Sequence, residues 1–256
     1  MESASIWLVG ALFVVVSTAV GLVGLELLSP FLRAHLKVNH NDVSASFATR
    51  MGTVYAVLLA FVVLAVWQRY LAADASVNSE AAALVSAYRA GQSLPEPMRT
   101  DAAIALRAYA ARLPEEWLTH ASLTPHVTPD PLNRVWSALR DAREVAGANV
   151  SNPAETALQQ LEVQRHTRHL ASQQTLPGVF WWILVAGGLT NIVISYLFAF
   201  EPMWHHRLLT GMLSLMIGSV LFLIFALNAP FNGQVHVSTD PIRHALLQFD
   251  ALDRIS

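Results

Sequence analysis

Histidines with a nearby acid are the first residues in this chain whose types and spacing could do chemistry. The sequence has ten histidines, and His166 and His169 lie three residues apart on a predicted helix, with Glu162 four residues before His166. Such spacing can place imidazole nitrogens on one helix face, where a divalent metal could bind. Arg165 and Arg168 share the same turns, and their positive charges would repel a cation. We therefore expect no metal site.

The remaining catalytic candidates are equally weak. Glu201 precedes His205 by four residues, but the proline between them disrupts helical spacing. Glu115 and Glu116 form an acid pair, yet adjacent residues on a helix point about 100° apart. The sequence contains no cysteine, no glycine-rich phosphate loop, and neither a GxSxG nor an HExxH motif. We expect no enzyme and no cofactor.

Composition favours a membrane protein with a polar domain. Of the 256 residues, 54% are hydrophobic and 13% are charged, about half of the roughly 25% that is usual in soluble domains. The mean hydropathy is +0.42. A net charge of -2 gives no basic surface for nucleic acid, which we exclude as a partner.

Four apolar segments are candidate membrane spans. The first lacks a basic start and a cleavage site, so it is a membrane helix rather than a signal peptide. We expect Pro30 to close it, and Glu26 near its end is either a functional acid or a helix-end residue that reaches the headgroups. The predicted spans are residues 6–28, 51–67, 179–200 and 208–228.

The second span continues into a long helix, from Arg50 to Gly91, because no Pro or Gly interrupts the pattern after Arg69. Gly52, Ala56 and Ala60 are spaced by four, and such small residues let another helix approach closely in lipid. The partner is either another helix of the same subunit or a helix of a second subunit.

The chain therefore predicts an all-α, four-span transmembrane protein in which the long second helix extends into a helical extramembrane domain. Thr100, Asp130-Pro131 and Asn152-Pro153 are helix start signals in that domain, and Pro114 begins a further turn. Residues 118–128 are expected to form a loop, and a short amphipathic helix follows Asp240-Pro241. The predicted divisions are a hairpin at 1–69, the helical domain at 70–176, a second hairpin at 177–228 and a tail at 229–256.

Polar residues in and near the third span are the remaining site candidates. Asn191 and Ser195 share one helix face with Gly187, and they serve either to line a pore or to bind helices together. Arg165 and Arg168 either attract anions or lipid headgroups near the membrane, or form ion pairs with Glu162 or other acids of the domain. Positive charges are equal on the two sides of the spans, so charge does not decide the orientation.

Several short motifs occur in a recognisable order along nearly the whole chain, and together they resemble the bestrophin-like family of bacterial and plant membrane proteins. The matching residues are Asn41-Asp42, Gly52, Tyr55 to Phe61, Trp67, Val77, Glu80-Ala81, Tyr109, Glu116-Trp117, Arg165, Arg168, Leu176-Pro177, Trp181, Pro230-Phe231 and Gly233.

The resemblance implies a more distant similarity to bestrophins, which are pentameric ion channels with four spans and a cytosolic helical domain. Residues Asn228 to Gly233 look similar to the Asn-Pro-Phe-Gly segment of that family but are interrupted. The acidic run that binds calcium in animal bestrophins is absent.

On this basis we expect an ion channel in the bilayer of the bacterial inner membrane, formed as a homo-oligomeric ring of four or more subunits, with the domain and termini in the cytosol. The alternative is a non-conducting scaffold or sensor whose helical domain binds a partner.

Overall fold

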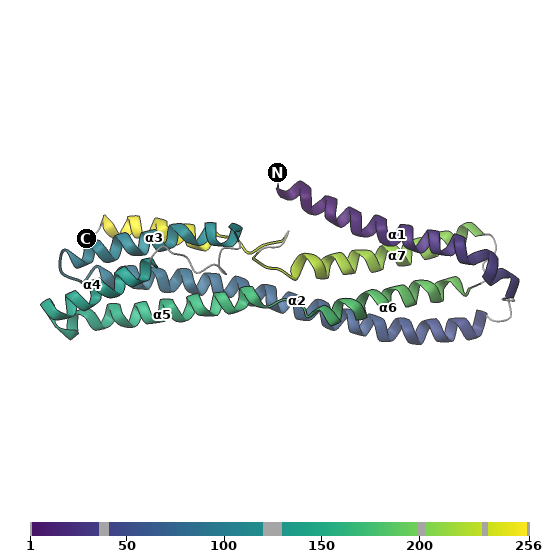
Figure 1. The fold of residues 1–256 in the computed structure, drawn as a ribbon, viewed down its shortest axis with the longest axis horizontal. Coiled ribbons are helices and arrows are strands. Elements are labelled where there is room, and N and C mark those ends of the chain that lie inside the picture. The colour runs from purple at the N-terminus through teal and green to yellow at the C-terminus, as the bar shows by residue number, and fades with distance from the viewer. Residues whose placement is uncertain (1, 36–40, 120–129, 199–202, 232–234, 255–256) are drawn as a thin grey trace. The chain divides into compact units, whose positions relative to one another are not determined.

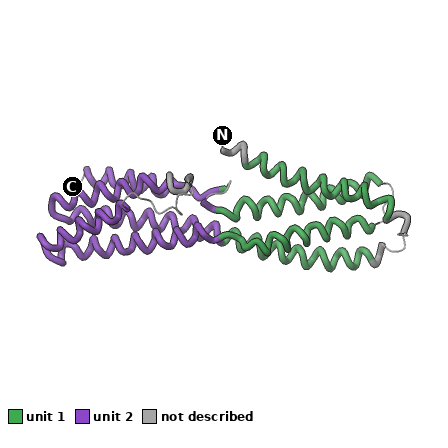
Figure 2. The backbone as a smooth tube through the Cα atoms, in the orientation of Figure 1, with its two compact units in different colours: residues 1–68, 175–229, 233–235 green, residues 69–174, 230–232, 236–256 purple. Residues whose placement is uncertain are grey.

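The computed structural model describes residues 2–35, 41–119, 130–198, 203–231 and 235–254 (Figure 1). Within these ranges every regular element is an α-helix and there is no strand, which confirms the all-α prediction. The chain divides into two compact units (Figure 2). Unit 1 comprises residues 1–68, 175–229 and 233–235, and unit 2 comprises residues 69–174, 230–232 and 236–256.

Unit 1 contains the membrane-spanning part of the chain. Four helical segments are long and apolar enough to cross a bilayer, which confirms the four-span prediction. The elements are α1 (Glu2–His35), the first part of α2 (Asn41–Gly91), α6 (Gly178–Tyr196) and α7 (Met203–Leu227).

Helix α1 does not end at Pro30, so that prediction was wrong: the helix continues to His35. Proline cannot donate to the carbonyl four residues earlier, here that of Glu26. The Ser29 hydroxyl donates to that Glu26 carbonyl instead, at 3.4 Å. Side-chain hydroxyls commonly replace the missing donor in membrane helices, which is how a proline can be tolerated there.

Helices α1 and α7 approach closely because small residues meet where they cross. A Cβ added to Gly218 would lie 2.0 Å from the Ser17 hydroxyl, so no larger residue fits without a shift. Ser17 Oγ also donates to the Ser214 carbonyl at 2.8 Å. Close contact between small residues and hydrogen bonds of this kind hold helices together in lipid, where the hydrophobic effect does not.

Unit 2 is a helical bundle with its own apolar core. It contains the second part of α2 with α3 (Met98–Thr119), α4 (Pro131–Ala146), α5 (Ala148–Gln173) and α8 (Asp240–Asp253). Leu84, Leu106 and Leu158 are among its fully buried residues, and Phe231 joins the same core.

Two start signals in unit 2 are confirmed. Asp130 caps α4 by accepting a hydrogen bond from the Leu132 amide at 3.1 Å, with Pro131 at the first helical position. Helix α8 begins at Asp240, also followed by proline. In both cases the signal lies wholly within the first turn, so it does not depend on tertiary contacts.

Three other boundaries differ from the prediction. Helix α3 begins at Met98 rather than after Thr100, and Glu96 accepts hydrogen bonds from the Thr100 hydroxyl and amide. Pro114 lies inside α3 instead of starting a new turn. Helix α5 begins at Ala148, not at Asn152-Pro153. Gly147, with a left-handed φ of 81°, interrupts the helix for a single residue, so α5 starts directly after α4 ends. Of the predicted loop 118–128, residues 118 and 119 belong to α3 instead, and residues 120–128 lie outside the described residues.

Candidate functional site

The first candidate site is the surface where α2 meets α6 in unit 1. Gly52 faces Asn191, since a Cβ at position 52 would lie 3.6 Å from Asn191 Oδ1. Three residues further along α2, the Tyr55 hydroxyl donates to the Leu184 carbonyl of α6 at 2.9 Å, and its ring covers Gly187. Gly52 therefore packs within one subunit.

Ala56 and Ala60 behave differently from Gly52. Both are exposed in the single chain, on a face of α2 that also exposes large apolar side chains. Phe61 is 67% exposed, whereas Val62 is only 4% exposed. Helix α2 thus buries one face in unit 1 and leaves the other uncovered by the described residues of the unit.

Asn191 and Ser195 both donate hydrogen bonds to backbone carbonyls of their own helix, α6. Asn191 Nδ2 donates to the Gly187 carbonyl of the same helix at 2.9 Å. Ser195 Oγ donates to the Ile192 carbonyl at 2.6 Å and lies 3.4 Å from the Thr210 hydroxyl of α7. Both side chains are half-buried. The contact between Ser195 and Thr210 fits a role in holding α6 against α7, and the pore-lining role of Asn191 stays a prediction.

The second candidate site is a charged cluster inside unit 2. Glu80 of α2 is fully buried, and it accepts hydrogen bonds from the Tyr109 hydroxyl of α3 and from Arg168 Nε of α5. Arg168 is itself only 7% exposed. A buried carboxylate and a buried guanidinium cost free energy unless they are paired and hydrogen-bonded, and here each meets the other. We name Glu80, Tyr109 and Arg168 the buried triad.

Arg165 extends this cluster by one helical turn. Its guanidinium forms an ion pair with Asp130, the residue that caps α4, and its Cζ lies 5.4 Å from the centroid of the Tyr109 ring. Burial, followed by the negative charge of Glu80, raises the pKa of Tyr109 well above its ordinary value of 10.0. Tyr109 therefore stays a neutral donor to Glu80 across the physiological pH range.

The sequence left two alternatives for Arg165 and Arg168, ion attraction or ion pairing. The structure places both in ion pairs, with Asp130 and Glu80 rather than with Glu162. Glu162 instead accepts a hydrogen bond from Trp136 Nε1 at 2.7 Å. A further role in attracting ions stays a prediction.

The sequence did not identify the contact between α8 and the rest of unit 2. Arg107 of α3 forms ion pairs with Asp250 at 2.8 Å and with Asp253 at 2.7 Å. The rings of Tyr88 and Phe249 stack with centroids 3.9 Å apart, and the Tyr88 hydroxyl donates to Asp253 at 2.7 Å. The amphipathic pattern of the tail indicated that one face of α8 is buried, but it did not indicate which residues cover that face.

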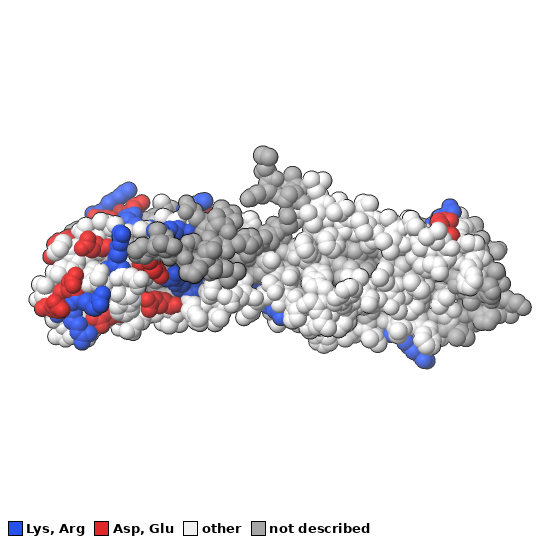
Figure 3. Space-filling model, in the orientation of Figure 1, with Lys and Arg blue, Asp and Glu red and all other residues white. Residues whose placement is uncertain are grey.

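Glu26, the acid expected near the end of the first span, forms an ion pair with Arg207 of α7 at 2.6 Å. Both side chains are about half-exposed. Elsewhere on the face that Figure 3 draws, charged residues gather over unit 2 and leave most of unit 1 uncharged. The pair links the ends of two spans, which agrees with a helix-end position for Glu26.

These features define an integral membrane protein with four helical spans and a separate helical unit that contains a buried triad. The bestrophin-like domain matches residues 5–242, and the chain belongs to the bestrophin-like family. No curated protein matches it.

Solved structures share the fold at low sequence identity. One mutant of a bacterial bestrophin homologue from Klebsiella pneumoniae superposes with a TM-score of 0.73 at 12% identity, over 95% of this chain and 98% of that one. A second mutant of a Klebsiella pneumoniae homologue gives 0.69 at 15% identity, over 98% and 99%. A mutant membrane protein gives 0.67 at 14%, over 98% of each chain.

Proposed function

We propose that this protein is an ion channel formed by a ring of four or more copies of the chain, with passive conduction through a central pore between subunits. The observation that carries the proposal is the uncovered face of α2. Ala56 and Ala60 lie exposed on a spanning helix whose opposite face is buried, and small residues at this spacing let a second helix approach closely. Membership of the bestrophin-like family supports the same conclusion.

A single subunit has too few spans to pack its own core and also enclose a pore. In the proposed ring, α2 lies nearest the axis, with the exposed Ala56 and Ala60 along it, while Gly52 faces the adjacent Asn191–Ser195 face of α6. Arg165, whose side chain is 34% exposed, is the proposed ion-attracting residue, because Arg168 is buried and paired with Glu80. The domain and both termini are proposed to lie in the cytosol, with the spans in the bacterial inner membrane.

The first experiment is to count subunits by native mass spectrometry after release from detergent micelles. The proposal expects one closed ring of four or more copies. Recording in planar bilayers follows, with Ala56→Trp expected to change conductance or break the ring, and Ala11→Trp as the matched control on an exposed face of α1. A monomer or simple dimer would remove the central pore and refute the proposal.

The second candidate is a non-conducting scaffold or sensor. It is favoured by the absence of any Asp, Glu, Lys or Arg from the spans at 51–67, 179–200 and 208–228, because selective filters often use rings of charged side chains. The two functions differ in the effect of Asn191→Leu. A channel shows altered conductance or selectivity, whereas a scaffold shows only altered stability.

A further inference from the structure

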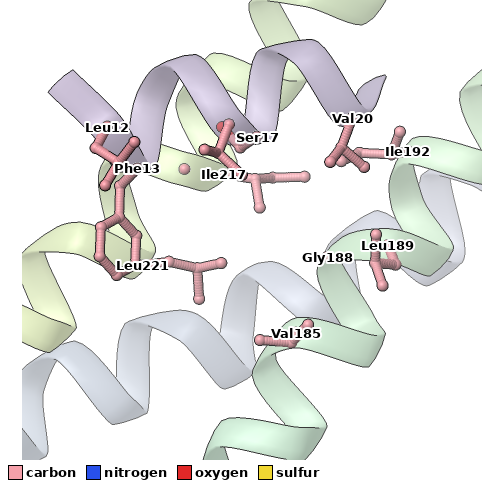
Figure 4. Close-up of a pocket in the computed structure, with 12 residues that line it drawn as sticks. Leu12, Phe13, Ser17, Val20, Val185, Gly188, Leu189, Ile192, Ile217 and Leu221 are labelled. Atoms are coloured by element: carbon pink, nitrogen blue, oxygen red, sulfur yellow. The ribbon is translucent and has the colours of Figure 1, made fainter. Parts of the chain in front are cut away.

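Unit 1 contains a cavity between α1, α6 and α7 (Figure 4). Its volume is about 350 Å³. Gly188 and Gly218 contribute no side chain to its wall, and Ile192 and Ile217 form its deep side, at 3% and 6% exposed.

The rim of the cavity faces outward from the bundle. Leu12 and Val16 of α1 are 60% and 51% exposed, and Val185 and Leu189 of α6 are 43% and 44% exposed. All four belong to helices that are apolar enough to span a bilayer. The environment that meets this rim is therefore the hydrocarbon of the membrane.

The lining offers nothing for a polar occupant. Ser17 has the only side-chain hydroxyl among the lining residues, and its Oγ already donates to the Ser214 carbonyl at 2.8 Å. No charged side chain lines the cavity. A buried water needs two to four polar partners, which this wall does not supply. An empty cavity would forfeit dispersion contacts along its whole wall.

We propose that this cavity binds one acyl chain of a membrane phospholipid. Its volume is more than twice that of the ~150 Å³ apolar cavity that holds a benzene molecule, which leaves room for a segment of hydrocarbon chain. The headgroup stays outside, because the wall has no cation to pair with a phosphate. The acyl chain completes the packing of α1 against α6, and the proposal is independent of whether the protein conducts ions.

The test uses phospholipid vesicles in which one acyl chain carries a diazirine, with the whole protein reconstituted and the cross-linked peptides located by mass spectrometry. Val185→Phe fills the cavity from its rim. Val193→Phe makes the same change on the same helix at a residue of similar exposure, 48% against 43%, that does not line the cavity. Leu189→Phe is a second filling variant.

We expect cross-links on Val16 and neighbouring cavity residues in the wild type and in Val193→Phe. In Val185→Phe or Leu189→Phe they should fall about tenfold, which corresponds to ~1.4 kcal/mol of lost binding. Added phospholipid should also raise the melting temperature of the wild type more than that of the filled variants.

Three results would overturn the proposal. The first is equal labelling of Val185→Phe and Val193→Phe, which would mean ordinary contact with bulk lipid. The second is labelling of the cavity residues by a water-soluble diazirine at a comparable level. The third is cross-linking of these residues to another copy of the chain, which would make the cavity part of a subunit interface.

Discussion

Removing the charge of Glu80 tests whether the buried triad holds unit 2 together. In Glu80→Gln the side chain keeps its size, but Arg168 loses its buried ion pair with Glu80. Loss of one partner of a buried ion pair costs about 3–5 kcal/mol. For a chain of this length each kcal/mol lowers the melting temperature by roughly 2–4 °C. We therefore expect a fall of about 6–20 °C.

The assay is thermal unfolding of the purified protein in detergent, followed by circular dichroism of the helices. Glu96→Gln is the matched control, because Glu96 forms an exposed ion pair with Arg99 at 2.6 Å. Such surface pairs contribute about 0–1 kcal/mol. The control should therefore melt within a few degrees of the wild type.

A double variant separates the charge effect from loss of packing. Glu80→Leu with Arg168→Met removes both buried charges together, and replacing a buried pair with apolar residues is often neutral or stabilising. We expect the double variant to be more stable than Glu80→Gln. The reasoning is refuted if Glu80→Gln unfolds together with Glu96→Gln, or if the double variant is the least stable of the three.

Three further predictions follow from single contacts. The hydrogen bond from Tyr88, and after it the Arg107 guanidinium, lower the pKa of Asp253. The ionised Asp253 therefore stabilises the folded state above its unfolded pKa of about 3.9. That stabilisation is lost as the pH falls through the folded pKa. Hydrogen exchange of the α8 amides, corrected for intrinsic rates, should show constant protection from pH 7 to 5 and weaker protection only in stronger acid. A loss of protection between pH 7 and 5 would contradict this. Gly187→Ala places a Cβ 2.7 Å from the Tyr55 ring, and we expect a loss of about 1–3 kcal/mol from overpacking, measured as a lower melting temperature. An unchanged melting temperature would show that the Tyr55 ring moves aside and would contradict this. Asp130→Ala removes the α4 cap and the Arg165 ion pair, and should cost about 1–3 kcal/mol in the same melt; Asp130→Asn should recover the share due to the cap.

The fold was predictable where the signals are local. Hydropathy alone locates the four spans, since about twenty consecutive apolar residues are the length of helix that crosses the hydrocarbon core of a bilayer. Asp130-Pro131 and Asp240-Pro241 fixed two helix starts for the same reason. Pro30 misled the prediction because its cost is offset by the Ser29 hydroxyl, and whether one hydroxyl reaches one carbonyl is not visible in a pattern of residue types.

The buried triad was less predictable because its members are far apart in the sequence. Arg168 pairs with an acid 88 residues away, whereas helical spacing brings the nearby Glu162 close only to Arg165, three residues along. The motif order behind the family resemblance did include Glu80, Tyr109, Arg165 and Arg168. That order identified the residues of the cluster but not which of them pair, because pairing depends on how four helices pack.

The composition of the unit 2 core has a consequence for biosynthesis. Phe231, Val237, Ile242 and Phe249 belong to that core, yet the ribosome makes them only after α7, the last span, has been made. Residues 69–174 are therefore made before their C-terminal partners, and Tyr88, which stacks on Phe249 in the folded unit, lacks that partner while two more spans enter the membrane. Exposed apolar surface of this kind is what chaperones bind and what drives aggregation. Nascent chains stalled between residues 175 and 229 are where we would look for bound chaperones.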